Sequence, residues 1–171
     1  MTMRSAIRSL AAGFGILAAS AIGMAATGPS ASSAPPPKAS APVYRPLTSD
    51  LMNDVIQPRH IKLWLAGKGG NWVFADYERH NIGGALARMA AAIPTYGGAS
   101  TASLIAAFAT PQLAALDTAI KAKDEAAFVT AYDGLTAGCN GCHQSTDHQM
   151  VVIKTPDSNP FPDQDFATPA H

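Results

Sequence analysis

The chain has 171 residues, a length typical of one domain, and its 12 Lys and Arg residues balance 12 Asp and Glu residues. This balance, together with the lack of any basic stripe, argues against nucleic acid as a partner. Only two cysteines are present, and a disulfide between them would close a loop too small to add much stability.

The first part of the chain has the composition of a secretory signal. Arg4 and Arg8 precede an apolar stretch at residues 10–26, which ends in small residues suited to a signal peptidase. We therefore expect residues 1–26 to be a cleaved signal peptide and the protein to reside in the periplasm, with no stable membrane span. An uncleaved anchor is the alternative, and several Gly and Ser residues weaken it as a span. Residues 27–46, rich in Ala, Ser and Pro, are expected to form a tether.

Two helices are expected in the first half of the folded part. Residues 50–66 form the first, in which Pro58 predicts a kink or a fresh start because it removes a backbone donor. Residues 72–92 form the second, with Asn71 as its N-cap. The pair Gly83-Gly84 in its middle is expected to let another helix or a flat ligand approach closely.

Two further helical segments complete the pattern. Residues 100–122 are expected to form two short helices or one kinked helix, because Thr110-Pro111 is typical of a new first turn. Asp124 begins the last segment, whose apolar residues recur at three- and four-residue spacings. Short connections between helices favour an all-α fold, an antiparallel four-helix bundle over residues 47–149. Residues 150–171 are expected to run over its surface.

The run CNGCH carries the chemistry of this sequence. Cys139, Cys142 and His143 share one face of the last helix, because residues three and four positions apart are neighbours on a helix. Two thiols can form thioethers with the vinyl groups of a porphyrin, while the adjacent imidazole reaches its iron. This spacing is the attachment signal for haem c, so we expect one covalent haem with His143 as an axial ligand.

Three other uses of these residues are open. A redox-active thiol pair is expected near a strand–helix–strand pattern, which this sequence lacks. A zinc site built from Cys139, Cys142, His143 and His148 is too compressed for the usual ligand spacings. A plain disulfide leaves His143 unexplained.

The position of the motif near the end of a helical domain resembles the class II c-type cytochromes, which comprise cytochrome c-prime and its low-spin relatives. The resemblance rests on LTAGCNGCH in the last helix and on LMND followed by GKGG in the first. It implies that a methionine early in the first helix, here Met52, is the second axial ligand. The family usually has an aromatic and a basic residue where this chain has Thr146 and Asp147. A basic contact to the haem propionates is therefore expected from elsewhere, such as Arg59 or Lys62.

The second axial ligand has several candidates. Met52 is favoured by the resemblance and by the affinity of a thioether for haem iron, although a helical Met is often simply core. His60 is the rival, about 12 Å farther along an unkinked helix. An open site is a third alternative, and His80, His148 and Met150 are weaker candidates. Tyr132, seven residues before Cys139, is expected to bind nearest the haem.

These residues predict an exported mono-haem cytochrome that carries one electron between periplasmic redox partner proteins. The alternative is a five-coordinate haem protein that binds or senses a diatomic gas such as NO or CO. Enzymatic activity is not expected, because no acid/base group beside the iron is recognisable unless His60 serves. Class II relatives are often dimers through their first helices, and the resemblance implies a homodimer by analogy alone.

Overall fold

The computed structural model describes residues 44–167, so the predicted signal peptide and most of the predicted tether lie outside the described residues. The described chain is mostly helical with little strand, which confirms the all-α prediction. Its helices are α1 (Thr48–Asp50), the π-helical η1 (Leu51–Ile56), α2 (Gln57–Lys68), α3 (Trp72–Ala92), α4 (Thr101–Phe108), α5 (Thr110–Ala122) and α6 (Glu125–Ser145), and its strands are β1 (Thr95–Tyr96) and β2 (Ala99–Ser100).

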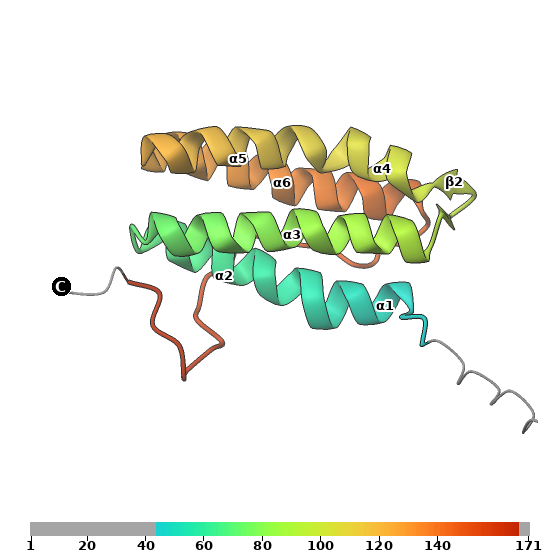
Figure 1. Ribbon diagram of the computed structural model, residues 1–171, viewed down its shortest axis with the longest axis horizontal. Coiled ribbons are helices and arrows are strands. Elements are labelled where there is room, and N and C mark those ends of the chain that lie inside the picture. The colour runs from blue at the N-terminus through green and yellow to red at the C-terminus, as the bar shows by residue number, and fades with distance from the viewer. Residues whose placement is uncertain (1–43, 168–171) are drawn as a thin grey trace, which may run out of the picture. The chain divides into compact units, whose positions relative to one another are not determined.

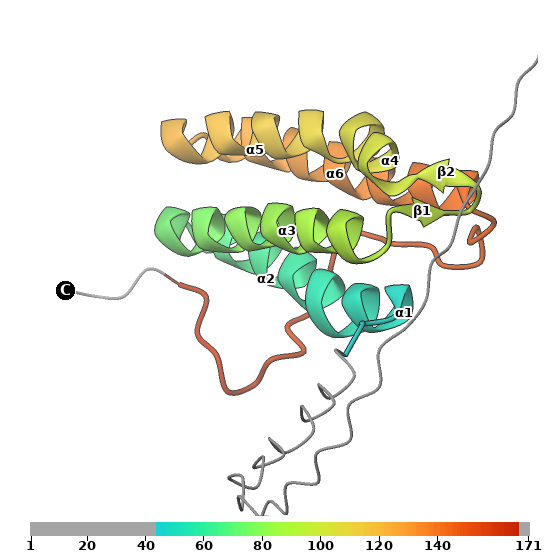
Figure 2. The same ribbon diagram turned by 45° about the vertical axis from the view of Figure 1, so that its right-hand side comes forward.

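The long helices lie side by side and alternate in direction along the chain (Figure 1). Helix α2 packs against α3, α3 packs against α5, and α5 packs against α6. The antiparallel pair β1–β2 forms a small hairpin between α3 and α4. Figure 2 shows this hairpin beside the carboxyl end of α6, where a side chain at Gly97 would touch Thr146.

The first helical segment accommodates Pro58 without a break. Helices α1, η1 and α2 follow one another directly from Thr48 to Lys68, and Pro58 lies in the first turn of α2. The preceding turn is widened, so that the amide of Gln57 donates to the carbonyl of Met52, five residues back. Proline cannot donate to the ladder, and a π-helical turn is a recognised way to absorb such a defect. Met52 therefore lies in an irregular turn.

The other helix boundaries follow local capping. Helix α3 spans the predicted residues, and the Asn71 side chain accepts from the Phe74 amide at 3.1 Å. Helices α4 and α5 meet at 43°, where Pro111 falls in the first turn of α5, as the sequence predicts. Asp124 caps α6 through the Ala127 amide at 3.0 Å. By length and apolar composition, no single helix within residues 44–167 could cross a membrane, although α4 and α5 together pass the same test.

Aromatic side chains fill one end of the helical domain. Trp64 of α2 lies 4.8 Å from Tyr132 and 6.3 Å from Phe128 of α6, and Trp72 of α3 lies 5.9 Å from Phe128 by ring centroids. Gly67 faces the Phe128 ring so closely that any side chain there would overlap it. We call these four rings, Trp64, Trp72, Phe128 and Tyr132, the aromatic end.

The chain after α6 runs over the surface as predicted, but it is also fastened to the helices at several points. Most of residues 150–167 are exposed or half-buried, and Figure 2 shows them running back along the helices. Phe166, however, is buried and stacks on Phe74 at 5.6 Å. Hydrogen bonds from Asn140 of α6 to the Ile153 carbonyl and from Thr155 to Asp133 of α6 also fasten this segment. The tail therefore forms part of the packed domain.

Candidate functional site

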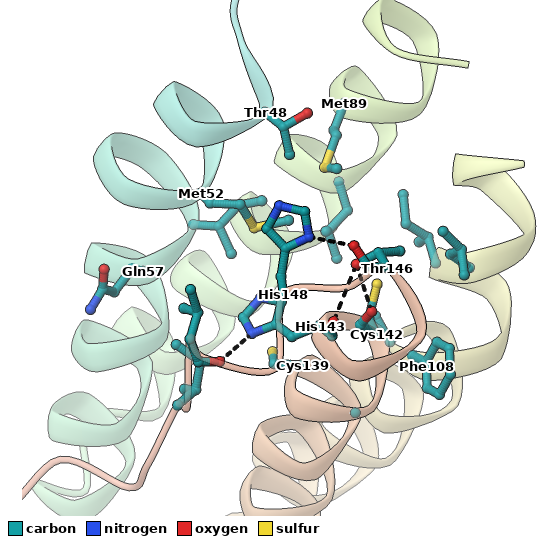
Figure 3. A pocket seen from close by; sticks show the side chains of 18 of the residues that line it. Thr48, Met52, Gln57, Met89, Phe108, Cys139, Cys142, His143, Thr146 and His148 are labelled. Carbon is teal, nitrogen blue, oxygen red and sulfur yellow. Dashed lines mark hydrogen bonds between the residues drawn. The ribbon is translucent and has the colours of Figure 1, made fainter. Parts of the chain in front are cut away.

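A mainly apolar cavity lies at the opposite end from the aromatic rings. It has a volume of about 230 Å³ and lies between the first helical segment, α3, α4 and the carboxyl half of α6 (Figure 3). None of its lining side chains is Asp, Glu, Lys or Arg. The apolar side chains that line it are Met52, Ile56, Ile82, Leu86, Met89, Leu104, Ile105, Phe108, Ala109, Leu135, Val151 and Ile153.

Glycines on α6 bring α4 close to the cavity wall. A side chain at Gly138 would collide with the Phe108 carbonyl, and a Cβ at Gly141 would lie 2.9 Å from the Phe108 ring. Gly141, within CNGCH, therefore lies where a side chain would press on the Phe108 ring. Gly83-Gly84, in contrast, do not line this cavity, and a Cβ at Gly83 would make only an ordinary 3.8 Å contact with Leu113. Helix α5 therefore makes only an ordinary contact with this pair, and a close approach by a flat ligand stays a prediction.

The three motif side chains converge on the cavity. Cys139, Cys142 and His143 all line it from α6, and Figure 3 shows them on one side of the opening. Burial, and then the nearby Cys142 thiol, raises the pKa of Cys139 to about 11, and burial also raises the pKa of Cys142. Both are free thiols. A redox-active pair needs a lowered thiol pKa, so these environments disfavour that alternative.

His143 is held by the chain that follows α6. Its Nδ1 lies 2.8 Å from the Val151 carbonyl, which can only accept, so Nδ1 carries the proton. Nε2 then bears the lone pair. Of the three histidines that line the cavity, His143 alone has a ring nitrogen with no hydrogen-bond partner among the described residues. An imidazole fixed through one nitrogen to a carbonyl is the usual arrangement of a metal-binding histidine.

His60 has the opposite character. It lines the cavity, but its Nδ1 lies 2.8 Å from the Tyr132 hydroxyl and its Nε2 lies 3.0 Å from the Thr136 hydroxyl. Burial lowers the pKa of His60 to about 4, so the ring is neutral at pH 7. Since both nitrogens already have partners, His60 joins α2 to α6 and offers no free lone pair.

Tyr132, which the sequence predicts to lie nearest the haem, does not line the cavity. It is fully buried. Its hydroxyl donates to the His60 carbonyl at 2.9 Å, and its ring packs on Trp64. Tyr132 therefore stands behind the cavity wall, in the aromatic end.

Two methionines reach the cavity from other helices. Met52 lines it from η1, as expected of a ligand candidate, and Met89 lines it from α3 and is buried. His148 also lines the cavity (Figure 3), and its Nδ1 donates to the Thr146 carbonyl while its Nε2 lies 2.7 Å from the Tyr96 hydroxyl. Met89, Tyr96 and Phe108 were missed by sequence reasoning. None belongs to a motif, and only the fold brings them to this cavity.

The basic residues expected near the site are engaged elsewhere. Arg59 pairs with the buried Glu78 at 3.3 Å, and Lys62 lies over the Phe161 ring at 4.6 Å. Neither lines the cavity. The first helical segment instead contributes uncharged polar side chains at four-residue spacing, Ser49, Asn53 and Gln57. The cavity therefore offers hydrogen bonds to a ligand and no ion pair.

Within residues 44–167, no group of three or more His, Cys, Asp and Glu side chains is arranged to hold a metal ion, and this covers the four residues considered for zinc. Comparisons with protein-family models, with curated proteins and with solved structures found no match to the chain. The functional argument therefore rests on the cavity and its residues.

Proposed function

We propose that this protein is a mono-haem c-type cytochrome that carries single electrons. Cys139 and Cys142 would bind one haem through thioethers, and His143 would bind its iron through Nε2. Such a haem supplies an iron that cycles between the ferrous and ferric states. The protein residues bind the haem, orient it and shield it from water.

One observation carries the proposal. Both thiols of the motif and the one cavity-lining histidine nitrogen that lacks a hydrogen-bond partner among the described residues face the same mainly apolar cavity, which side chains leave unfilled. A flat, apolar and iron-containing ligand matches each of these features. A disulfide or a zinc ion would use the sulfur atoms and leave most of the cavity unexplained.

The proposed function extends to the fold and its location. We propose that the alternating helices form the antiparallel four-helix bundle of a class II cytochrome, with the haem near its last helix. The sequence of residues 1–26 supports export to the periplasm, where redox partner proteins would exchange electrons with it. A homodimer through the first helices is part of the same analogy.

We propose that Met52 would be the second protein ligand of the haem iron. It lines the cavity from the helical segment that faces α6, and it lies in the widened turn before Pro58. A π-helical turn is frequent at functional sites because it redirects a side chain. His60 is disfavoured because both of its ring nitrogens have partners.

The test is the optical spectrum of three single variants in the exported, haem-containing protein. Met52→Ala is expected to turn the ferric form high-spin, to allow CO to bind the ferrous form, and to lower the reduction potential, because a thioether stabilises ferrous iron. Met89→Ala and His60→Gln are the matched controls, since both residues also line the cavity, and they are expected to stay low-spin.

Other outcomes reassign the site. If Met89→Ala or His60→Gln opens the iron while Met52→Ala is silent, the ligand is the other residue. If the unaltered protein is already high-spin and binds CO, the iron is five-coordinate, and gas binding replaces electron transfer as its function.

A further inference from the structure

The motif contains a residue with no assigned role. Asn140 follows Cys139, and its side chain makes two hydrogen bonds to one residue of the tail. Its Nδ2 donates to the Ile153 carbonyl at 2.8 Å, and the Ile153 amide donates to its Oδ1 at 2.7 Å. The amide of Asn140 thus pairs with both backbone groups of Ile153, as a neighbouring strand would.

This pairing lies next to the hydrogen bond that fixes His143. Val151, whose carbonyl accepts from Nδ1 of His143, is only two residues before Ile153. The segment has no regular secondary structure, and Val151 and Val152 are 45% and 74% exposed. Burial therefore does not hold the Val151 carbonyl in place. The two bonds from Asn140 are the nearest fixed point on its carboxyl side.

We propose that Asn140 is a positioning residue for the iron ligand. By clamping Ile153, it holds the Val151 carbonyl against His143, which fixes the ring orientation and increases its electron donation to the iron. A hydrogen bond of this kind raises the basicity of a metal-binding imidazole, and more basic ligation favours the ferric state. The inference rests on the proposed haem function, and it assigns the control of the reduction potential to a residue outside the ligand set.

The experiment compares Asn140→Ala and Asn140→Leu with Thr155→Ala in the exported, haem-containing protein. Leu has nearly the shape of Asn, so an effect shared by both variants comes from the lost hydrogen bonds. Thr155 is the matched control, because its hydroxyl also ties the tail to α6, through Asp133 at 3.1 Å, without contacting Val151 or Ile153. The measurements are the midpoint potential, the ferric magnetic resonance spectrum and the hydrogen exchange rate of the Ile153 amide.

Both Asn140 variants are expected to retain covalent haem, to raise the midpoint potential, to change the ferric spectrum and to speed Ile153 exchange more than tenfold. Thr155→Ala is expected to leave the potential and the spectrum unchanged. Faster Ile153 exchange with an unchanged potential and spectrum would overturn the proposal and leave Asn140 as a tail anchor. Unchanged exchange would show that the clamp does not form. Absence of haem from the unaltered protein would instead refute the proposed function.

Discussion

The space between the helices is filled differently at the two ends of the helical domain. At the aromatic end, four rings from α2, α3 and α6 fill the space between helices, and Phe128 and Tyr132 have no exposed surface. At the other end, the first helical segment, α3, α4 and the carboxyl half of α6 surround a mainly apolar cavity of about 230 Å³. Protein interiors are normally close-packed, so an apolar cavity that side chains leave unfilled is a natural place for a bound ligand.

Under the proposed function, the contrast separates the part of the fold that would depend on the haem from the part that would not. His60 and Tyr132 mark the boundary, because His60 lines the cavity while its hydrogen-bond partner Tyr132 belongs to the aromatic end. The aromatic end is held by side chains alone. The cavity end would gain most of its buried contacts from the haem.

The largest effect is expected from removing the attachment site. In the haem-free double variant Cys139→Ala, Cys142→Ala, the cavity end should lose its filling. Amides of η1, α4 and the carboxyl half of α6 are expected to exchange hydrogen more than about tenfold faster than those around Phe128. Residue-resolved hydrogen exchange measures this difference. Uniform protection across both ends, equal to that of the haem-containing protein, would contradict the account.

The next largest effects are expected from replacing one aromatic residue at each end of the haem-containing protein. Phe128→Ala is expected to cost about 3–5 kcal/mol of stability, because its ring is fully buried. The haem spectrum should not change, since Phe128 does not line the cavity. Phe108→Ala, at the half-buried cavity wall, is expected to cost less, about 1–2 kcal/mol, and to alter the spectrum. Denaturant unfolding and optical spectroscopy measure the two effects. A changed haem spectrum in Phe128→Ala, with a larger loss of stability in Phe108→Ala, would show that the two ends are wrongly assigned.

A smaller effect concerns pH and the boundary between the ends. Burial lowers the pKa of His60 from the ordinary 6.5 to about 4, so the unfolded chain binds a proton more readily than the folded one in this range. Stability should therefore be full above pH 6.5 and should fall by on the order of 3 kcal/mol as the pH drops to about 4. His60→Gln should reduce this dependence of the unfolding free energy on pH, whereas His80→Gln, at an exposed position of α3, should not. Equal slopes in both variants, measured by denaturant unfolding, would remove His60 from the account.

Much of the fold was predictable because it depends on local signals. Asn71 and Asp124 cap their helices as their side chains dictate, and Thr110-Pro111 divides α4 from α5. Pro58 shows the limit of such reasoning. Its missing donor is visible in the sequence, but whether the chain kinks, breaks or widens depends on how the neighbouring helices pack.

The sequence identified the motif residues and the cavity-lining candidates Met52, His60 and His148, but not the rest of the site. Tyr132 shares a helix face with Cys139, yet seven residues amount to about 10 Å along the axis, which places its ring in the other end. Tyr96 and Phe108 come from a hairpin and a separate helix, and nothing local marks them as cavity residues. The carbonyl of Val151 is a backbone group, so no sequence pattern could identify it as the partner of His143.

The most direct test of the central claim is acid-acetone extraction of the full-length protein, produced in a bacterium that matures c-type cytochromes and isolated from its periplasm. The account predicts one haem per polypeptide that stays with the precipitated protein and gives the pyridine haemochrome spectrum of a porphyrin bound through two thioethers. Protein without haem, while a control cytochrome made in the same cells is loaded, would contradict it. So would haem that leaves with the solvent.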